Sequence, residues 1–300
     1  MEHTDTLAAL SNGMADAVEN VATAVVRVNG RRRRSGSGVV FAQNMVLTAS
    51  HVLEREEDLS VETADGRTLS ARFAGRDHST DLAVLNVEDL DIDPATPAEG
   101  DARVGQISLA VGSHSRGEGP RATLGVVSAV GGPVRSRRGP RVERYIQTDA
   151  TPYPGFSGGP LIDARGDVLG ILVSGWGRGA AFAIPADIAW RTAGTLSERG
   201  SVKRGYLGIL SQPVRLPNGQ SLGLTQRGGL LVVGVEDGSP ADRGGLIVGD
   251  ILATLDGQPI EDTEDLLMLL AGDRVGRSVP VKLVRGGELT EVEITVGERG

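Results

Sequence analysis

The sequence predicts a mainly β protein with a β-rich N-terminal part and a smaller α+β module at its C-terminal end. Its 300 residues suit two domains, of which the larger has ample length for a core. The 43 glycines and an aromatic fraction of only 3% favour turn-rich β structure with aliphatic cores over a helical bundle. Short β-type runs, separated by glycine, proline, aspartate and asparagine, fill residues 24–184. This pattern predicts a barrel or sandwich.

The N-terminal part begins with a helical pattern and continues in strands. Within residues 5–19, apolar positions recur at roughly helical spacing and predict a short amphipathic helix. Residues 24–28 and 38–41 are expected to be strands flanking a turn at Asn29-Gly30, since this dipeptide is typical of hairpins. Further strands are expected at 45–48, 59–63, 69–75, 82–87, 107–111, 123–130, 145–148, 161–162, 168–174 and 181–184. Pro185 then precedes a predicted helix over 186–196.

The sequence pattern changes after this helix. Residues 197–204 are polar and contain glycine, which is typical of a linker. Beyond them, strand patterns at 230–235, 250–255, 278–284 and 289–296 alternate with helical patterns at 241–244 and 263–270. We therefore expect an N-terminal segment (1–23), a β domain (24–196), a linker (197–204) and an α+β domain (205–298).

Composition restricts the class of protein. The net charge of −8 argues against a general nucleic-acid binder, because no global positive field would attract phosphates. Cysteine is absent, so no disulfide supports the fold. Residues 1–20 lack a basic stretch followed by an apolar one, and no run is long and apolar enough to span a bilayer. We expect a soluble, cytoplasmic protein, with an extracytoplasmic location as the alternative if a leader has been removed.

Three residues carry the strongest chemical signal. Ser157 lies in the run Gly-Phe-Ser-Gly-Gly-Pro over 155–160, and His51 and Asp81 precede it in the chain. A serine hydroxyl becomes nucleophilic when an imidazole takes its proton and a carboxylate fixes the imidazole tautomer. Taken singly, each residue has a structural explanation, such as a turn or a cap. Their order of His, Asp and Ser favours a chymotrypsin-type arrangement over subtilisin or the nucleophile-elbow hydrolases.

Four strings carry a resemblance to a known family: TASHVL (48–53), STDLAVL (79–85), YIQTDA (145–150) and GFSGGPL (155–161). They resemble the HtrA (Deg) family of trypsin-like serine proteases. The resemblance implies a chymotrypsin-like double β-barrel to about residue 195, with the active site between the barrels. It makes His51 the general base, Asp81 its orienting carboxylate and Ser157 the nucleophile. The oxyanion hole would use the N–H groups of Gly155 and Ser157, with Phe156 adjoining.

Phe156 departs from the family pattern, which usually has asparagine at this position. A phenylalanine makes no polar contacts, so the loop must be held in another way. We expect an apolar lock, in which Phe156 packs in a pocket while Pro152, Tyr153 and Pro154 stiffen the approach. The oxyanion hole would then be formed more permanently than in switchable relatives. The rival hypothesis is that Phe156 distorts the hole and cripples the protease.

Substrate-binding residues are expected on two segments. Residues 173–177 resemble the strand that pairs with the substrate backbone, which implicates Ser174, Gly175 and Trp176, although Trp176 also suits ordinary wall packing. Thr151 is expected near the pocket for the residue before the scissile bond. The family resemblance implies small aliphatic side chains there.

Two groups of arginines stand out. Residues 31–34 are all arginine at the expected hairpin tip, and we interpret them as a solvated face. Five further arginines lie within 135–144, where the family has a regulatory loop. We interpret this second group in two ways, which are evenly matched. It either contacts carboxylates or forms a solvated face.

The C-terminal module resembles a PDZ domain. The run Gly-Tyr-Leu-Gly-Ile at 205–209 and the run Val-Glu-Asp-Gly-Ser-Pro-Ala at 235–241 carry this resemblance. A PDZ groove binds a peptide as an added strand and holds its terminal carboxylate with backbone N–H groups. Residues Tyr206, Leu207, Gly208 and Ile209 match that loop and strand. Leu266, Leu267 and Leu270 are candidates for groove or core, and we expect at least half of them in the core.

The leading function is an ATP-independent serine endopeptidase that degrades unfolded or damaged proteins, with the PDZ domain binding C-terminal peptides. The alternative is a catalytically impaired chaperone or peptide-binding scaffold. No metal site or cofactor motif is visible in the sequence, and the chemistry requires neither. Family resemblance implies a homotrimer, often built with N-terminal aromatic residues, although residues 1–30 contain none. No nucleic-acid partner is expected.

Overall fold

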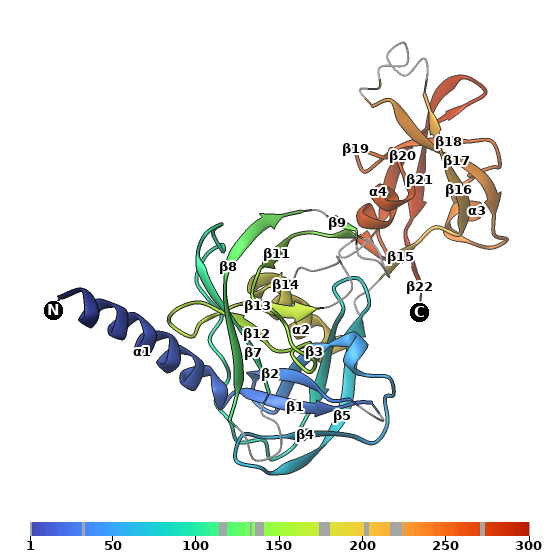
Figure 1. The fold of residues 1–300 in the computed structure, drawn as a ribbon. Coiled ribbons are helices and arrows are strands. Elements are labelled where there is room, and N and C mark those ends of the chain that lie inside the picture. The colour runs from blue at the N-terminus through green and yellow to red at the C-terminus, as the bar shows by residue number, and fades with distance from the viewer. Residues whose placement is uncertain are drawn as a thin grey trace. The chain divides into compact units, whose positions relative to one another are not determined.

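A computed structural model of the chain describes residues 2–31, 34–113, 119–132, 134–135, 141–173, 181–200, 204–216, 224, 226–270 and 274–299. Its contacts divide the chain into two units, Met1–Val202 and Lys203–Gly300. Two six-stranded barrels make up most of the first unit, and a sheet with short helices makes up the second (Figure 1). The prediction of a mainly β chain with a double barrel followed by an α+β domain is thus confirmed.

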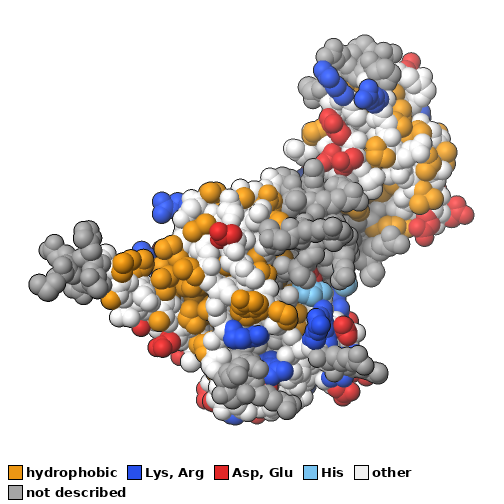
Figure 2. Space-filling model, viewed as in Figure 1, with side chains coloured by type: hydrophobic (Ala, Val, Ile, Leu, Met, Phe, Trp, Pro, Cys, Tyr) orange, Lys and Arg blue, Asp and Glu red, His pale blue; other side chains and the backbone are white. Residues whose placement is uncertain are grey.

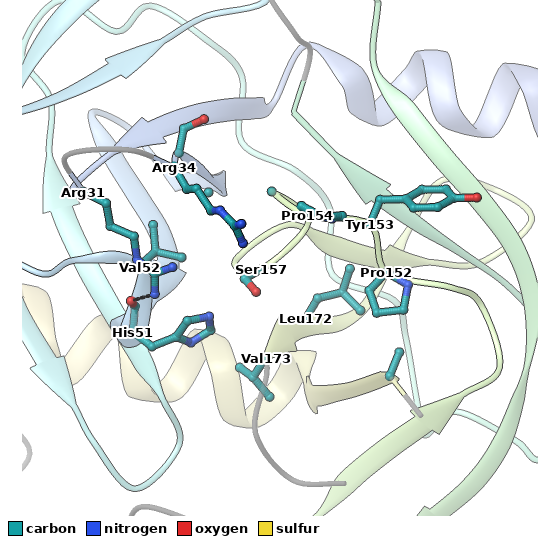
Figure 3. Close-up of a pocket in the computed structure, with 14 residues that line it drawn as sticks. Arg31, Arg34, His51, Val52, Pro152, Tyr153, Pro154, Ser157, Leu172 and Val173 are labelled. Carbon is teal, nitrogen blue, oxygen red and sulfur yellow. Dashed lines mark hydrogen bonds between the residues drawn. The ribbon is translucent and has the colours of Figure 1, made fainter. Parts of the chain in front are cut away.

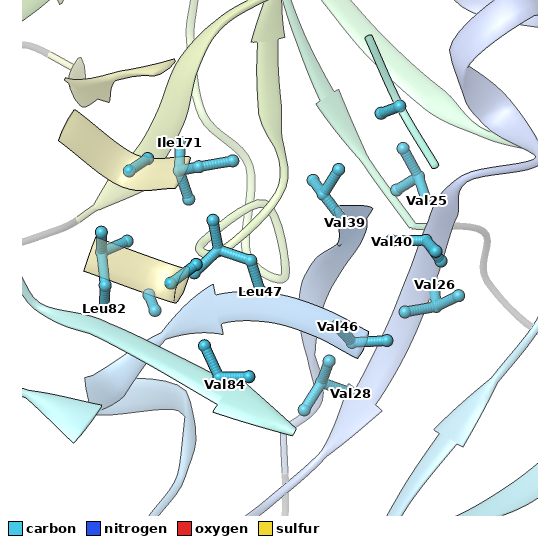
Figure 4. Close-up of a cluster of buried hydrophobic side chains, with 14 of the residues drawn as sticks. Val25, Val26, Val28, Val39, Val40, Val46, Leu47, Leu82, Val84 and Ile171 are labelled. Atoms are coloured by element: carbon cyan, nitrogen blue, oxygen red, sulfur yellow. The ribbon is translucent and has the colours of Figure 1, made fainter. Parts of the chain in front are cut away.

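The first barrel closes in the strand order β1-β2-β3-β6-β5-β4. Its strands are β1 (Val25–Asn29), β2 (Gly36–Ala42), β3 (Met45–Ala49), β4 (Leu59–Glu62), β5 (Thr68–Asp77) and β6 (Leu82–Asn86). A single 3-10 turn, η1 (Ser50–Val52), follows β3. Alternating aliphatic residues from these strands point toward one another inside the barrel, as Figure 4 shows for Val28, Val46 and Val84. Burial of these side chains supplies the main driving force for the barrel.

The second barrel closes in the order β11-β14-β13-β12-β7-β8. Its strands are β7 (Ile107–Gly112), β8 (Arg121–Gly131), β11 (Tyr145–Thr148), β12 (Pro160–Ile162), β13 (Val168–Val173) and β14 (Ala181–Pro185). A short ribbon of β9 (Val134–Arg135) and β10 (Arg141–Val142) extends from it. Closure pairs every strand on both sides, so neither barrel leaves a long open edge.

The loop between β1 and β2 differs from the expected two-residue hairpin. The register pairs Val28 with Gly36, and Asn29 still belongs to β1, so residues 30–35 form the connection. Gly30 lies against Val52 and Leu53, where a Cβ atom would come within 2.6 Å of the Leu53 side chain. The glycine is therefore needed for close packing, and the Asn-Gly pair does not make the turn.

Two helices frame the barrels. The N-terminal helix α1 spans Glu2–Ala22, longer than predicted, and buries only its last turns through Ala17 and Val21. Helix α2 spans Ala186–Arg199 and packs Ile188, Ala193 and Leu196 into the core that both barrels share. Pro185 is its N-cap, and Gly200 ends it in the left-handed conformation at φ 73°. The first residues of the expected linker, 197–199, thus form the last turn of this helix.

The second unit contains a larger antiparallel sheet, a separate two-stranded sheet of its first and last strands, and two short helices. Its strands are β15 (Arg204–Tyr206), β16 (Ile209–Arg215), β17 (Gly228–Val235), β18 (Ile251–Leu255), β19 (Gln258–Pro259), β20 (Ser278–Arg285), β21 (Glu288–Thr295) and β22 (Gly297–Arg299). The sheet order is β16-β17-β18-β20-β21, which makes β16 an edge strand. Helices α3 (Pro240–Arg243) and α4 (Thr263–Leu269) complete the unit. Leu266 and Leu270 are buried, whereas Leu267 is 46% exposed, so two of the three leucines belong to the core.

Within the described part of the chain, no helix is long and apolar enough to cross a membrane.

Candidate active site between two barrels

Pairing of β3 with β6 brings His51 to Asp81. Ala49 at the end of β3 lies opposite Leu82 at the start of β6, so the residues that follow one strand meet the residue that precedes the other. His51 Nδ1 lies 2.5 Å from Asp81 Oδ2, and the His51 backbone N–H donates to Asp81 Oδ1 at 2.9 Å. The two side chains are only 12% and 17% exposed. Asp81 thus holds both the backbone and the ring of His51.

Asp81 adopts a backbone conformation that few side chains tolerate. Its φ is 57°, in the left-handed region where aspartate and asparagine are the usual non-glycine residues. Its carbonyl oxygen accepts a 2.7 Å hydrogen bond from the Ser50 N–H. The turn therefore orients the carboxylate toward the imidazole and is itself tied to the segment that carries the imidazole.

The loop before β12 carries Ser157. Residues 153–156 form a four-residue turn, in which the Phe156 N–H donates to the Tyr153 carbonyl at 3.0 Å. Pro154 occupies the second position and Gly155, with φ 97°, the third, which matches a type II turn. A positive φ at this point favours glycine, because a Cβ atom would strain the backbone.

The carbonyl groups of this loop are all occupied. Those of residues 154–157 each accept one hydrogen bond, and the donors are, in order, Arg121 Nη2 (3.1 Å), Ser37 Oγ (2.6 Å), the Gly159 N–H (2.9 Å) and the Ser37 N–H (2.9 Å). A trans peptide directs its C=O and N–H to opposite sides. Because Arg121 holds the Pro154 carbonyl on one side, the Gly155 N–H faces the other.

The N–H groups of the loop are divided differently. Phe156 uses its N–H inside the turn, and the Gly158 N–H donates to the Leu172 carbonyl at 2.8 Å. Among the described residues, the N–H groups of Gly155 and Ser157 have no acceptor. Unpaired backbone donors are rare away from water, so a pair of them beside one serine is a feature of a binding site for an oxygen anion.

Phe156 is packed as an apolar anchor beneath the loop. Its side chain is fully buried, and its ring meets the Tyr153 ring edge-on with centroids 5.9 Å apart. The Arg121 guanidinium lies over the ring at 5.3 Å from its centroid. Gly112 lies on the opposite wall, where a Cβ atom would come within 2.4 Å of the ring. Such contacts fill the place where a polar side chain would need hydrogen-bond partners.

Ser37 joins the two barrels at this loop. It lies on β2 of the first barrel, is fully buried, and uses both its hydroxyl and its N–H on carbonyl groups of the Ser157 loop. Its oxygen also accepts the Ser113 N–H at 2.8 Å. Sequence reasoning missed both Ser37 and Arg121, and only the small-residue run Gly36-Ser37-Gly38 hinted at close packing here.

A pocket of about 640 Å³ opens at Ser157 and His51 (Figure 3). One wall comes from the first barrel and includes Arg31, Arg34 and Val52. The other wall comes from the second barrel and includes Pro152 and Leu172. Arg31 and Arg34 therefore both line the pocket. Arg34 is exposed, as the interpretation of residues 31–34 as a solvated face expects, whereas Arg31 is partly buried and donates to the His51 carbonyl.

The remaining predicted residues of the substrate site are not among the described residues that line the pocket. Thr151 is exposed, its carbonyl accepts a 2.9 Å hydrogen bond from Thr123, and the lining of the pocket begins at the next residue. Ser174, Gly175 and Trp176 lie outside the described residues. In the second arginine group, Arg144 forms ion pairs with Asp101 and Asp187, and its hydrogen bond to Asp101 raises the pKa of Arg144. This arginine is therefore paired with carboxylates of the first unit, while residues 137 and 138 lie outside the described residues.

In the second unit, the predicted peptide-binding residues form a loop leading into the edge strand β16. Gly208 has φ 80°, and its carbonyl accepts the Glu236 N–H at 2.9 Å. Leu207 is buried, and its carbonyl accepts the Ala241 N–H at 2.8 Å. The N–H groups of Leu207 and Gly208 have no acceptor within the described part of the chain. The Tyr206 hydroxyl is bonded to Glu236.

A charged pair fastens the loop before β18. Arg285 donates to both oxygens of Asp250, at 2.8 and 2.7 Å, and the Asp250 side chain is 1% exposed. Burial alone would raise the pKa of this carboxyl, but the hydrogen bonds from Arg285 and from the Ile247 N–H outweigh it and lower the pKa below 3.8. The same interaction raises the pKa of Arg285.

Comparison with known proteins places both units in described families. A trypsin-like peptidase domain model matches residues 36–171, and a PDZ domain model matches residues 205–296. The chain is therefore a trypsin-like peptidase domain joined to a PDZ domain.

The solved structures identify the family. An HtrA-type protease, AlgW with a decapeptide, shares 31% identity and a TM-score of 0.78, with 96% of this chain and 99% of that chain covered. The serine endoprotease from Yersinia pestis shares 30% identity and the same TM-score of 0.78, with coverages of 96% and 98%. The chain belongs to the HtrA family of trypsin-like serine proteases.

Curated relatives are longer proteins. A probable periplasmic serine endoprotease, DegP-like, from Halomonas elongata is 37% identical over 276 residues, covering 89% of this chain and 57% of the relative. One of the same name from Pseudomonas fluorescens is 36% identical over 269 residues, covering 87% and 56%. The chain thus spans a little over half the length of these relatives.

Proposed function

We propose that the chain is a serine endopeptidase in which His51, Asp81 and Ser157 form the catalytic triad. The observation that carries this proposal is the Ser157 loop. The carbonyl groups of residues 153–157 all accept hydrogen bonds, while the Gly155 and Ser157 N–H groups have no acceptor among the described residues. The 2.5 Å contact of His51 Nδ1 with Asp81 supports it, because that contact directs the other ring nitrogen, Nε2, to the serine.

The reaction would proceed in two balanced halves. Ser157 Oγ attacks the carbonyl carbon of the scissile bond while its proton passes to His51 Nε2, and the carbonyl oxygen becomes an anion bound by the two N–H groups. His51 then gives that proton to the leaving amine, the C–N bond breaks, and an acyl-Ser157 ester remains. Water repeats the sequence, with its proton passing through His51 to Ser157 Oγ as the ester is hydrolysed.

The oxyanion hole is proposed to be formed without an activator. Burial of Phe156 between Tyr153, Gly112 and Arg121 supports the apolar lock over the rival distorted hole. In that arrangement the turn has no polar side chain that must find a partner before the N–H groups are aligned. Small aliphatic residues before the scissile bond fit the apolar wall at Leu172 and Pro152.

We propose further that unfolded or damaged proteins are the substrates and that no nucleotide is hydrolysed. The second unit would bind C-terminal peptides as a strand added to β16, with the carboxylate on the Leu207 and Gly208 N–H groups. Support comes from the open edge of β16 and from the peptide in the AlgW structure. The predicted domain limits, with the peptidase domain over 24–196 and the PDZ domain over 205–298, remain part of this proposal.

The proposed assembly is a homo-oligomer, a trimer by family resemblance. Helix α1 exposes Leu7 and Leu10, and β8 exposes Leu124. Figure 2 shows hydrophobic side chains gathered where this helix meets the barrel. Because the relatives are named periplasmic, an extracytoplasmic location replaces the cytoplasmic expectation as our proposal. Mass measurement in solution tests the assembly.

The test of function is digestion of casein by the full chain and by Ser157→Ala, each with and without a C-terminal peptide. Cleavage by the wild-type chain alone is expected, and Ser157→Ala removes it. Equal rates for the two proteins would overturn the peptidase proposal in favour of a scaffold.

A further inference from the structure

The loop between β1 and β2 brings positive charge to the catalytic pocket. Its C-terminal end is fixed beside the nucleophile, because the Ser37 N–H donates to the Ser157 carbonyl at 2.9 Å and a Cβ atom on Gly36 would lie 3.1 Å from that oxygen. Arg34 stands only three residues before this contact. Figure 3 shows its guanidinium directed toward Ser157. The position of Arg34 in the pocket therefore follows from the register of β2.

The two arginines of the pocket are held differently. Arg31 donates to the backbone carbonyl of His51, and its Nε lies 3.4 Å from a carboxylate oxygen of Glu54. Arg34 is exposed, and its guanidinium has no acceptor or acidic partner among the described residues. Arg31 is thus anchored to the segment that carries His51, while the N–H donors of Arg34 are available to a ligand.

The described lining of the pocket supplies no negative charge to balance Arg34. None of the 14 described residues that line it is aspartate or glutamate. Asp81 stands behind the imidazole and is committed to it. An arginine whose five donors are unused is a strong recognition group for a carboxylate, because the planar fork matches two carboxylate oxygens. The missing partner is therefore expected to come with the substrate.

Chemistry decides which half of the substrate meets these arginines. The imidazole must give its proton to the leaving amine, so the residues after the scissile bond pass on the His51 side of Ser157. Figure 3 shows Arg31, Arg34 and His51 on one side of Ser157, with Leu172 and Pro152 on the other. The acyl half thus faces the apolar wall, and the leaving half faces the arginines.

We propose that Arg34, supported by Arg31, binds a carboxylate in the leaving half of the substrate, within the first two residues after the scissile bond. The carboxylate belongs either to an aspartate or glutamate side chain or to a chain that ends there. This inference rests on the proposed peptidase function and adds a substrate preference to it. The preference weakens with salt, because the site is open to solvent.

The first test compares peptides that share one acyl half and carry amidated C-termini. They place aspartate, asparagine or lysine at the first or second position after the scissile bond. For the full-length chain we expect kcat/KM to be about tenfold higher for aspartate than for asparagine, the low end for a hydrogen bond to a charged group. In Arg34→Gln this ratio falls to about 1, and in Arg34→Glu the lysine peptide becomes the best of the three.

Arg55→Glu is the matched control. Arg55 lies in the same barrel, and its replacement changes the net charge as Arg34→Glu does. Among the described residues, it donates only to the Asp58 carbonyl and does not line the pocket. The wild-type preference is expected to persist in this variant. Its loss there would mean that overall charge, and not the pocket, sets the preference, which would overturn the proposal.

A second arm separates the two sources of the carboxylate. Peptides that end directly after the second position are compared as free acids and as amides. Since the second unit is proposed to bind free C-termini, only the part of the difference that Arg34→Gln removes is assigned to this pocket. A gain for the free acid alone identifies chain ends as the ligand, and a gain for internal aspartate alone identifies the side chain.

Binding to Ser157→Ala keeps this test separate from that of the peptidase. Fluorescence anisotropy with the amidated peptides is expected to show tighter binding of the aspartate peptide, and loss of that difference when Arg34→Gln is added. If the wild-type chain cleaves no peptide while this difference is present, the peptidase proposal fails and the carboxylate site stands. Equal binding and equal cleavage of the aspartate and asparagine peptides would overturn the carboxylate site.

Discussion

The two barrels hold their parts of the proposed active site by different physical means. In the first barrel, His51 is held by both oxygens of one carboxylate, at 2.5 and 2.9 Å. In the second, Ser157 follows a turn that lies on a buried phenylalanine ring, and Arg121 and Ser37 donate hydrogen bonds to two carbonyl groups of that turn. The hydrogen bonds that orient His51 are lost when the charge of Asp81 or the tautomer of the ring changes. The packing that holds the Ser157 loop is lost when the shape of the buried side chain changes.

This difference separates orientation of the base from formation of the anion site. In the first barrel, one carboxylate sets the tautomer of the His51 ring. Replacing a single oxygen atom of Asp81 therefore removes the control of that tautomer. The second barrel spreads the support over Phe156, Arg121 and Ser37, so single replacements there are expected to have graded effects. Substitutions on each side can test whether the division is real.

The largest effect is expected for Asp81→Asn. An amide in place of the carboxylate favours the wrong tautomer of His51, which is expected to lower kcat by about 10⁴-fold. Asp65→Asn, which removes an exposed carboxylate from the same barrel, should change turnover by no more than about twofold. Peptide hydrolysis by both variants is the measurement, and a loss below about tenfold in Asp81→Asn would contradict the polar support.

Phe156→Ala is expected to follow. Loss of a buried ring costs about 3–5 kcal/mol of stability and frees the turn. Misalignment of one oxyanion donor lowers kcat by about 10²–10³-fold. Phe41→Ala, which removes another ring of the first unit away from the pocket, controls for stability alone. If the two variants lose stability and kcat in parallel, the ring has no specific role in the active site.

Arg121→Gln should give a smaller loss. The variant removes the cationic donor to the Pro154 carbonyl and the charge over the Phe156 ring. We expect kcat to fall about tenfold with little change in KM, because the lost contact orients the anion site and does not bind the ground state. Arg72→Gln, at an exposed pair with Glu88, is the matched control. An effect on KM alone would assign Arg121 to substrate binding instead.

The smallest effect on turnover is expected for Arg285→Met in the second unit. Breaking its pair with buried Asp250 costs about 3–5 kcal/mol within that unit, while cleavage of a short peptide is unchanged. Both tryptophans belong to the first unit, so their fluorescence should keep its unfolding midpoint while calorimetry shows an earlier transition. A shifted tryptophan midpoint would contradict independence of the two units.

The same pair predicts a dependence on pH. Its hydrogen bonds lower the pKa of Asp250 below its ordinary value of 3.8, so folding stability from this group is fully present above pH 3.8. It is lost as the pH falls through the lower folded value. Calorimetry of the full chain between about pH 5 and pH 2 is the measurement. As the pH falls, the unfolding temperature of the second unit should drop more steeply for wild type than for Arg285→Met.

Local chemistry explains which parts of the fold were predictable. Aliphatic alternation between turn residues marks most strands of both barrels, because each strand buries one face in a closed core. The family resemblance placed a strand at Ile209, but its continuation to Arg215 was not predicted, since Ser211, Gln212 and Pro213 interrupt the apolar pattern and an edge strand tolerates all three. The Asn29-Gly30 pair misled because its glycine serves packing against Leu53.

The residues of the candidate site also fall into those that the local sequence predicts and those that it does not. His51, Asp81 and Ser157 are recognisable because their chemistry is carried by short strings around each residue. Ser37 and Arg121 act across 118 and 33 residues of sequence, through contacts that exist only after the barrels have closed. Arg34 belongs with them, because only the register of β2 brings it to the pocket. Long-range contacts of this kind leave no local pattern.

The central claim is that the apolar lock keeps the anion site formed without an activator. The most direct test is the rate at which a fluorophosphonate probe labels Ser157 in the wild-type chain and in Phe156→Asn, with and without a C-terminal peptide. We predict that the wild-type rate is high and changes by less than about twofold with peptide, while Phe156→Asn reacts slowly and gains rate when peptide is added. A wild-type chain that reacts only with peptide, or a Phe156→Asn variant as fast as wild type without it, would contradict the account.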